Sequence, residues 1–246
     1  FIQLFDASVT FDRPYDGSRL SPEAFGATGD DDSDDHVALW TMIMQTEYAR
    51  GNPASTYTHN ADAWTQSSPL TRAGVFDWDL GGATIQTTDD SNLTHIITNT
   101  NFGVSGRYHF PFDGFDVVRL TNGTFQGNML ASRFVYLRDV DEFRIAGMTV
   151  RDLLSPADSF ARAVAFGFEL HPAPLGGFVR GEILDNRIEN VNAIGDNRIN
   201  NGLGISKAFT FSIRDNGPGE IFIERNEITN ILGDDAEGLY TRYDGD

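Results

Sequence analysis

Apolar and polar residues alternate in short runs that recur along the chain. The clearest run, residues 221–231, has the spacing apolar-x-apolar-x-x-Asn-x-apolar, and weaker copies occur at four earlier places. The central apolar residues of the five copies, at intervals of 40, 25, 38 and 40 residues, are Leu80, Leu120, Ile145, Ile183 and Ile223. Alternation with a period of two indicates β-strands, and self-similarity at an interval of about 20 to 50 residues is typical of solenoids and propellers.

A second β-rich run precedes three of the copies, and Gly, Pro and Asp residues separate it from the copy that follows. These runs are residues 134–137, 165–170 and 209–213. Strand, turn, strand and loop, repeated at a minimum interval of 25 residues, correspond to one coil of a parallel β-helix. A propeller blade needs four antiparallel strands, for which the interval between Leu120 and Ile145 is too short. We therefore predict an all-β fold, a right-handed parallel β-helix or solenoid.

Residues 36–50 have helical spacing instead. The predicted apolar face consists of Val37, Trp40, Ile43, Met44 and Tyr48. Ser33, Asp34 or Asp35 supplies the N-cap, and Gly51 is the stop signal. Because an open solenoid exposes apolar core at its end, we predict that this segment is an N-terminal capping α-helix.

The segment before this helix resembles a known signature. Residues 25–30 read Phe-Gly-Ala-x-Gly-Asp, and Asp34 and Asp35 follow directly before the helix. This arrangement resembles the N-terminal signature of the pectate-lyase-like right-handed parallel β-helix superfamily, which includes polysaccharide lyases and phage tailspikes. The match covers residues 23–45, although Asp31 stands where the family usually has Gly. The resemblance implies the solenoid fold and lyase, hydrolase or epimerase chemistry on polysaccharides.

These patterns divide the chain into three parts. We predict a lead-in segment at residues 1–22, an N-terminal cap at residues 23–74 and β-helix coils at residues 75–246. Residues 238–243 have the pattern of the first strand of another coil, so we expect the natural protein to continue beyond residue 246.

The net charge of the chain limits the kinds of macromolecule that it can bind. The chain has 36 acidic and 18 basic residues, a net charge of −18, and Lys207 is its only lysine. Such a chain repels nucleic acid and anionic membranes, so we predict neither as a partner. The sequence lacks cysteine and also lacks an apolar run long enough for a membrane span. The acidic residues are explained by solubility or by divalent-cation binding. No cofactor is required, and Ca²⁺ is the ion they could hold.

Two rows of asparagine recur in successive copies. Asn186 and Asn226 occupy equivalent positions, and Asn190 and Asn230 follow four residues later. Stacked asparagines at a turn can exchange amide hydrogen bonds and satisfy the backbone there. A sugar-binding row is the alternative interpretation.

A mixed charged row is predicted on the outer face, because neighbours in a strand point to opposite sides. The residues that directly precede the five central apolar residues are Asp79, Arg119, Arg144, Glu182 and Phe222. The row is explained by surface ion pairing. In the alternative, Arg119 and Arg144 bind substrate by gripping a sugar carboxylate.

Residues 233–238 contain the predicted catalytic carboxylates, Asp235 and Glu237, with Asp234 beside them. Glycoside hydrolysis uses two carboxyl groups across the scissile bond. On an extended strand Asp235 and Glu237 share a face, and Asp234 points away. The segment faintly resembles the Gly-Asp-Asp of polygalacturonases, but the other signatures of that family do not occur in the sequence. A solvated acidic turn is the alternative.

Residues 99–115 form an aromatic loop in the predicted arrangement, with Arg107, Tyr108 and His109 as candidate substrate-binding residues. Aromatic rings stack on flat apolar surfaces such as sugar rings. Packing over the coils, or a subunit contact, explains the loop equally well.

The leading functional hypothesis is an extracellular or virion-surface β-helix that binds and degrades a polysaccharide, as a lyase or a glycoside hydrolase. The alternative is a non-catalytic structural or adhesive protein of a virion or surface assembly, a homotrimer in contact along its coils. A third interpretation takes the acidic loops as Ca²⁺ sites that serve stability alone.

Overall fold

The computed structural model describes residues 20–59, 70–88, 95–98, 108–130, 133–138, 140–155, 162–170, 178–193, 205–214 and 219–244. Most of these residues lie in strands, and every strand pairing among them is parallel. The prediction of a mainly β chain with parallel strands is therefore confirmed. In the part of the chain described here, no helix has the length and hydropathy needed to cross a membrane.

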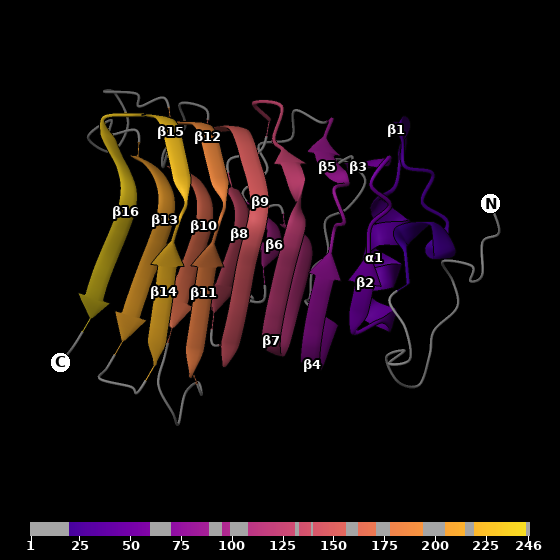
Figure 1. Ribbon diagram of the computed structural model, residues 1–246, viewed down its shortest axis with the longest axis horizontal. Helices are drawn as coiled ribbons and strands as arrows, with labels where there is room; N and C mark the ends of the chain where they lie inside the picture. The colour runs from indigo at the N-terminus through magenta and orange to yellow at the C-terminus, as the bar shows by residue number, and fades with distance from the viewer. Residues whose placement is uncertain are drawn as a thin grey trace.

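The strands form three parallel ladders, stacked along the long axis of the molecule (Figure 1). Ladder A consists of β2 (Tyr48–Arg50), β4 (Leu70–Asp79), β7 (Tyr108–Gln126), β9 (Glu142–Ser155), β11 (Arg180–Leu184) and β14 (Glu220–Glu224). Ladder B consists of β1 (Asp30–Asp34), β3 (Thr56–His59), β5 (Thr84–Thr87), the second halves of β7 and β9, β12 (Arg187–Ala193) and β15 (Glu227–Leu232). Ladder C consists of the first residues of β7, β6 (His95–Thr98), β8 (Arg133–Arg138), β10 (Arg162–Leu170), β13 (Ile205–Arg214) and β16 (Asp235–Asp244).

The register of ladder A follows the predicted repeat in its C-terminal part. Ile145 pairs with Leu120 on one side and with Ile183 on the other, and Ile183 pairs with Ile223. The predicted alignment of Leu80 with Leu120 is wrong, because Trp78 pairs with Leu120. The turn between β4 and β5 contains two consecutive glycines with positive φ, which lengthen this copy and shift its first strand by two residues.

The core lies between the ladders. Leu120, Ile145 and Ile183 of ladder A are completely buried. Aromatic rings join the ladders: Phe125 of β7 stacks on Phe134 of β8, with ring centroids 4.3 Å apart. Such stacking adds to the free energy gained by burying each ring. The aromatic residues therefore fix the spacing between ladders as well as filling the interior.

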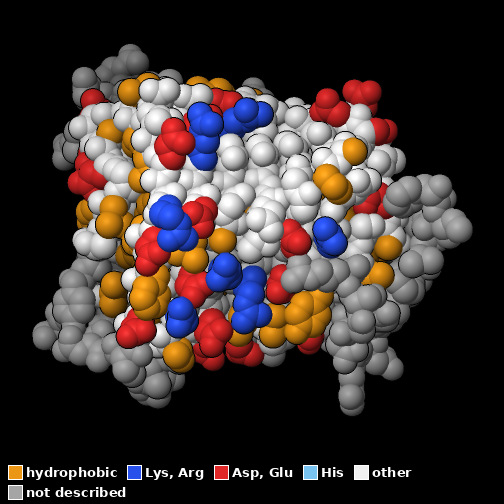
Figure 2. Space-filling model, in the orientation of Figure 1, with side chains coloured by type: hydrophobic (Ala, Val, Ile, Leu, Met, Phe, Trp, Pro, Cys, Tyr) orange, Lys and Arg blue, Asp and Glu red, His pale blue; other side chains and the backbone are white. Residues whose placement is uncertain are grey.

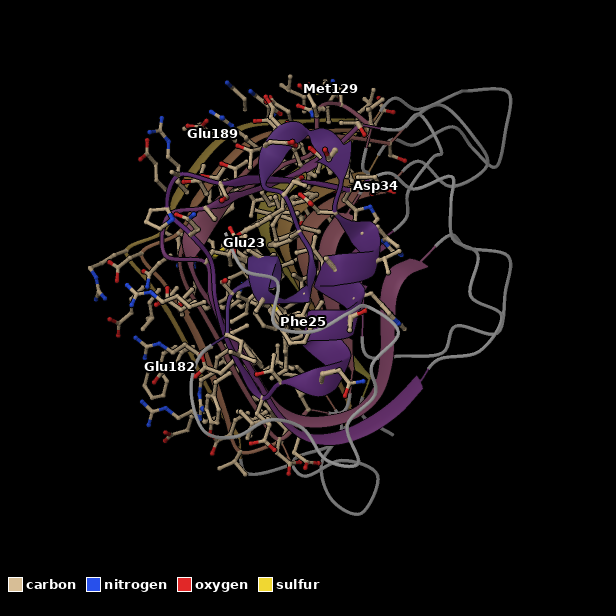
Figure 3. The ribbon with its side chains drawn as sticks, turned by 90° about the vertical axis from the view of Figure 1, so that its right-hand side faces the viewer. Glu23, Phe25, Asp34, Met129, Glu182 and Glu189 are labelled. Atoms are coloured by element: carbon tan, nitrogen blue, oxygen red, sulfur yellow. The ribbon has the colours of Figure 1, made fainter. Side chains whose placement is uncertain are left out.

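The N-terminal end of the stack is covered by α1 (His36–Gln45) and η1 (Pro22–Phe25), as Figure 3 shows in a view along the stack. A helix at this place was predicted, and Trp40 and Ile43 of its predicted apolar face are buried. The face is wrong at Val37, which is 49% exposed, and it omitted Leu39 and Met42, which are completely buried. Tyr48 lies in β2, because the chain leaves the helix after Gln45 and pairs with β4, before the predicted stop at Gly51.

Asp35 explains why the Phe-Gly-Ala-x-Gly-Asp segment precedes this helix. Asp35 is the N-cap residue, but its buried carboxylate accepts hydrogen bonds from the backbone N–H groups of Thr28, Gly29 and Thr58 instead of capping α1. Asp31 has a left-handed backbone with φ of 77°, a conformation that favours Gly. The segment is thus a turn that ties η1, α1 and β3 together.

Candidate functional site

The outer face of ladder A carries a charged row across five strands. The in-register residues are Asp77, Arg119, Arg144, Glu182 and Phe222. The prediction is confirmed for the last four. Asp77 replaces the predicted Asp79, which pairs with Thr121, for the same two-residue shift that moves Leu80.

A surface pocket of about 220 Å³ opens on this row, lined by Arg119, Glu142, Phe143, Arg144, Arg180 and Glu182. Figure 2 shows Lys and Arg side chains gathered among acidic and hydrophobic ones over β7, β9 and β11. Arg180 and Glu142 were missed from the sequence, although each lies two residues before a member of the row. Residues i and i+2 of a strand share a face, and this signal could have found both.

Glu182 is the least exposed of the charged side chains that line the pocket. Its side chain is 15% exposed, compared with 46% for Arg144 and 53% for Arg180. Arg144 Nη1 donates to Glu182 Oε2, while Arg180 Nε and Nη2 lie 2.9 and 2.7 Å from Glu182 Oε1. Burial alone would raise the pKa of Glu182, but the hydrogen bonds and charges of Arg180 and Arg144 outweigh it and lower the pKa. Glu182 is therefore a carboxylate.

Arg119 and Arg144 pair directly across β7 and β9. Like charges at directly opposed positions are unfavourable, and each arginine is compensated by acidic neighbours. Arg119 approaches Asp77 at 4.0 Å and Glu142 at 3.5 Å, and Arg144 binds Glu182. Each guanidinium has five N–H donors in a planar fork, so the pair can also bind hydroxyl or carboxylate oxygens at the surface.

The predicted catalytic pair lies on ladder C, on a different part of the molecule from this pocket. Asp235 and Glu237 share a face of β16, as predicted, since their carboxylates lie 2.8 and 2.9 Å from the Nζ of Lys207. The Lys207 side chain is 4% exposed, and its Nζ also lies 4.9 Å from the centre of the Tyr240 ring. Burial lowers the pKa of Lys207, but the two carboxylates raise it by a larger amount. Asp234 is exposed in the turn before β16.

The remaining predicted substrate-binding residues are only partly described. Arg107 lies outside the described residues. Tyr108 and His109 are the first two residues of β7, where the backbone of Tyr108 pairs with His95 of β6. The prediction of a loop is wrong for residues 108–115, because they pair with β6 and β4 as part of β7. That Tyr108 and His109 bind substrate stays a prediction.

The asparagine rows are hydrogen-bonded ladders, which confirms the structural interpretation. The first row lies between strands, whereas Asn190 and Asn230 of the second row lie within β12 and β15 and have positive φ. Asn186 Nδ2 donates to Asn226 Oδ1 and to the carbonyl oxygen of Ile145. In the second row Asn230 donates to Asn190, and Asn190 donates to Asp152. Asp152 was not predicted, because an aspartate replaces the recurring asparagine in that copy.

Among the residues that the structure describes, no three His, Cys, Asp or Glu side chains lie close enough together to hold a metal ion. The consecutive aspartates of β1 are engaged with the backbone, since Asp30 accepts hydrogen bonds from the N–H groups of Asp32 and Ser33. The Ca²⁺ interpretation stays a prediction.

Comparisons of the chain with protein-family models, with curated proteins and with solved structures found no match.

Proposed function

We propose that this chain is a right-handed parallel β-helix that binds a polysaccharide on the outer face of ladder A, at a cell or virion surface. The observation that carries the proposal is the pocket in which Arg119, Arg144 and Arg180 project from three neighbouring strands. On a chain with a net charge of −18, three guanidinium groups at one place form an unusual local arrangement. Parallel strands repeat such contacts at intervals of about 4.8 Å along the stack, which suits a chain-like ligand.

The chemistry of the pocket supports sugar recognition. Guanidinium groups donate several hydrogen bonds in fixed directions, and hydroxyl-rich ligands offer many acceptors. Phe222 continues the row on β14, and the guanidinium carbon of Arg180 lies 4.9 Å from the centre of its ring. An aromatic face beside polar donors is a common composition for ligand pockets.

The proposal is tested by binding to a panel of neutral and uronate-rich polysaccharides. Replacing Arg144 by Gln removes a charged donor and keeps a polar side chain, so affinity for the bound glycan should fall about tenfold or more. Arg187→Gln, on ladder B and paired with Glu189, is the matched control and should leave affinity unchanged. Absence of binding to every glycan of the panel would remove the proposal.

Catalysis is tested with the same panel, with and without Ca²⁺. We would follow chain length, reducing ends and the ultraviolet absorbance of a new ring double bond. Reducing ends with this absorbance identify a lyase, and reducing ends without it identify a hydrolase. In the second case Asp235→Asn and Glu237→Gln should abolish turnover.

A non-catalytic structural or adhesive protein, assembled as a homotrimer, is the second candidate. One observation favours it: Lys207 engages both predicted catalytic carboxylates in ion pairs. Sedimentation analysis distinguishes a trimer from a monomer, and binding without chain shortening would select this candidate.

A further inference from the structure

The pocket on ladder A contains a carboxylate held by two arginines. Both oxygens of Glu182 are used, Oε1 by Arg180 and Oε2 by Arg144. Charged pairs of this kind are how proteins bind the carboxylates of ligands. Figure 3 shows Glu182 on the outer side of the strands, so the carboxylate lies where a ligand at this face would arrive.

Groups other than Glu182 also act on the two arginines. The guanidinium of Arg180 lies over the Phe222 ring at 4.9 Å. The charge of Arg144 also acts on Asp185, whose pKa it helps to lower, and Glu142, 3.5 Å from Arg119, reduces the repulsion between Arg119 and Arg144. Removing the Glu182 carboxylate leaves two partly exposed guanidinium groups without the anion that now lies between them.

We infer that Glu182 is a specificity-determining residue: its carboxylate occupies the anion position between Arg144 and Arg180 and excludes the carboxylate of an acidic sugar. The inference rests on the proposed glycan-binding function and names its substrate class. With Glu182 in place, the three arginines of the pocket lining face two glutamates. A neutral glycan can use the remaining N–H donors, whereas a uronate must compete with an internal carboxylate at very high effective concentration.

The same sequence spacing occurs on ladder B, which provides a matched control. Arg187 and Glu189 of β12 stand two residues apart, like Arg180 and Glu182 of β11, and form an ion pair on the outer side of the strands (Figure 3). Glu189 lies outside the lining of the pocket. Glu189→Gln changes the net charge by the same amount as Glu182→Gln without opening the position between Arg144 and Arg180.

The experiment compares the wild type, Glu182→Gln and Glu189→Gln by calorimetric titration with uronate and neutral oligosaccharides of equal length. We expect Glu182→Gln to bind the uronate at least about tenfold more tightly than the wild type does. This gain should shrink as salt is raised, and neutral binding should stay within about twofold. An unchanged or weaker uronate affinity in Glu182→Gln would overturn the inference, as would an equal gain in Glu189→Gln.

A second measurement distinguishes failure of the glycan-binding proposal from failure of the inference about Glu182. The Nε–H resonances of Arg144 and Arg180 are followed by NMR during titration with glucuronate, a single sugar that needs no extended groove. Saturable shifts in Glu182→Gln and none in the wild type support the inference even when no oligosaccharide binds. Shifts that are absent or equal in both proteins overturn it. Glu182→Thr, which also removes the carboxylate and suits a strand, replaces Glu182→Gln when that variant does not melt cooperatively.

Discussion

Asn186 joins three neighbouring copies of the repeat through one buried side chain. Its Oδ1 accepts from the backbone N–H of Met148 at 2.9 Å, and its Nδ2 donates to the carbonyl oxygen of Ile145 at 3.0 Å. Its Nδ2 also donates to Oδ1 of Asn226 in the next copy. Such a residue satisfies backbone groups at a turn that water cannot reach.

We predict that Asn186→Ala lowers the free energy of unfolding by about 2 to 3 kcal/mol, because buried backbone groups of Ile145 and Met148 lose their partners. Asn226→Ala should cost less, since Asn226 is only partly buried. Urea unfolding of the two variants measures both effects. Equal losses would contradict the importance of burial at this turn.

At the same scale, the sequence predicted the asparagine rows because they recur within a local repeat. The predicted register of Arg144 and Glu182 was right, but Arg180 and Glu142, each two residues earlier on the same face of its strand, were missed. The sequence also predicted Asp79 in the charged row in place of Asp77, since no local signal shows by how many residues a glycine turn shifts the register.

Among the elements, α1 begins with a buried histidine at the N-terminal end of the stack. Its first residue, His36, is buried against His59, with Nδ1 and Nε2 of the two rings 2.8 Å apart. Burial lowers the pKa of His36 from 6.5 to about 4, and the charge of Asp34 only partly opposes this. The folded protein therefore keeps His36 neutral over a range in which the unfolded chain protonates it.

Between pH 6.5 and about 4, His36 binds more protons in the unfolded state than in the folded state. The free energy of unfolding therefore falls as the pH falls. We predict a loss of roughly 3 kcal/mol over this window from His36 alone. Urea unfolding at several pH values compares the wild type with His36→Gln. Parallel pH profiles for the two proteins would contradict the prediction.

β16 is fastened to β13 by an ion pair of unequal burial. Lys207 is almost fully buried, whereas its partners Asp235 and Glu237 are about half exposed. Removing the ammonium leaves two carboxylates that water can solvate, but removing both carboxylates leaves a buried charge without compensation.

We therefore predict that the double variant Asp235→Asn, Glu237→Gln is less stable than Lys207→Met by about 2 kcal/mol. Thermal unfolding compares them, and hydrogen exchange of β16 locates the change. Greater stability of the double variant than of Lys207→Met would contradict the prediction, because the buried ammonium would then cost little without its carboxylate partners.

The whole molecule carries a net charge of −18, and its compact state confines these charges. Exposed ion pairs such as Arg225 with Asp185 are individually weak and are screened by salt. Repulsion among the excess carboxylates is screened as well, and that screening favours the folded state.

We predict that the melting temperature rises when NaCl increases from about 10 mM to about 500 mM, because relief of net repulsion outweighs the weakened ion pairs. CaCl₂ at matched ionic strength tests the stabilising Ca²⁺ interpretation, since a specific site would add a further increase. A melting temperature that falls with NaCl would mean that the surface ion pairs dominate.

The sequence by itself determined the parallel repeat, the inward apolar positions and the turn asparagines. These follow from alternation and turn chemistry, which act over a few neighbouring residues. Only the tertiary structure decided which charged groups form ion pairs. It placed Arg180 and Arg144 on the two oxygens of Glu182 and directed Lys207 to Asp235 and Glu237. Such contacts depend on how long side chains orient across neighbouring strands and, in the copy at Leu80, on a register shift that the repeat does not show.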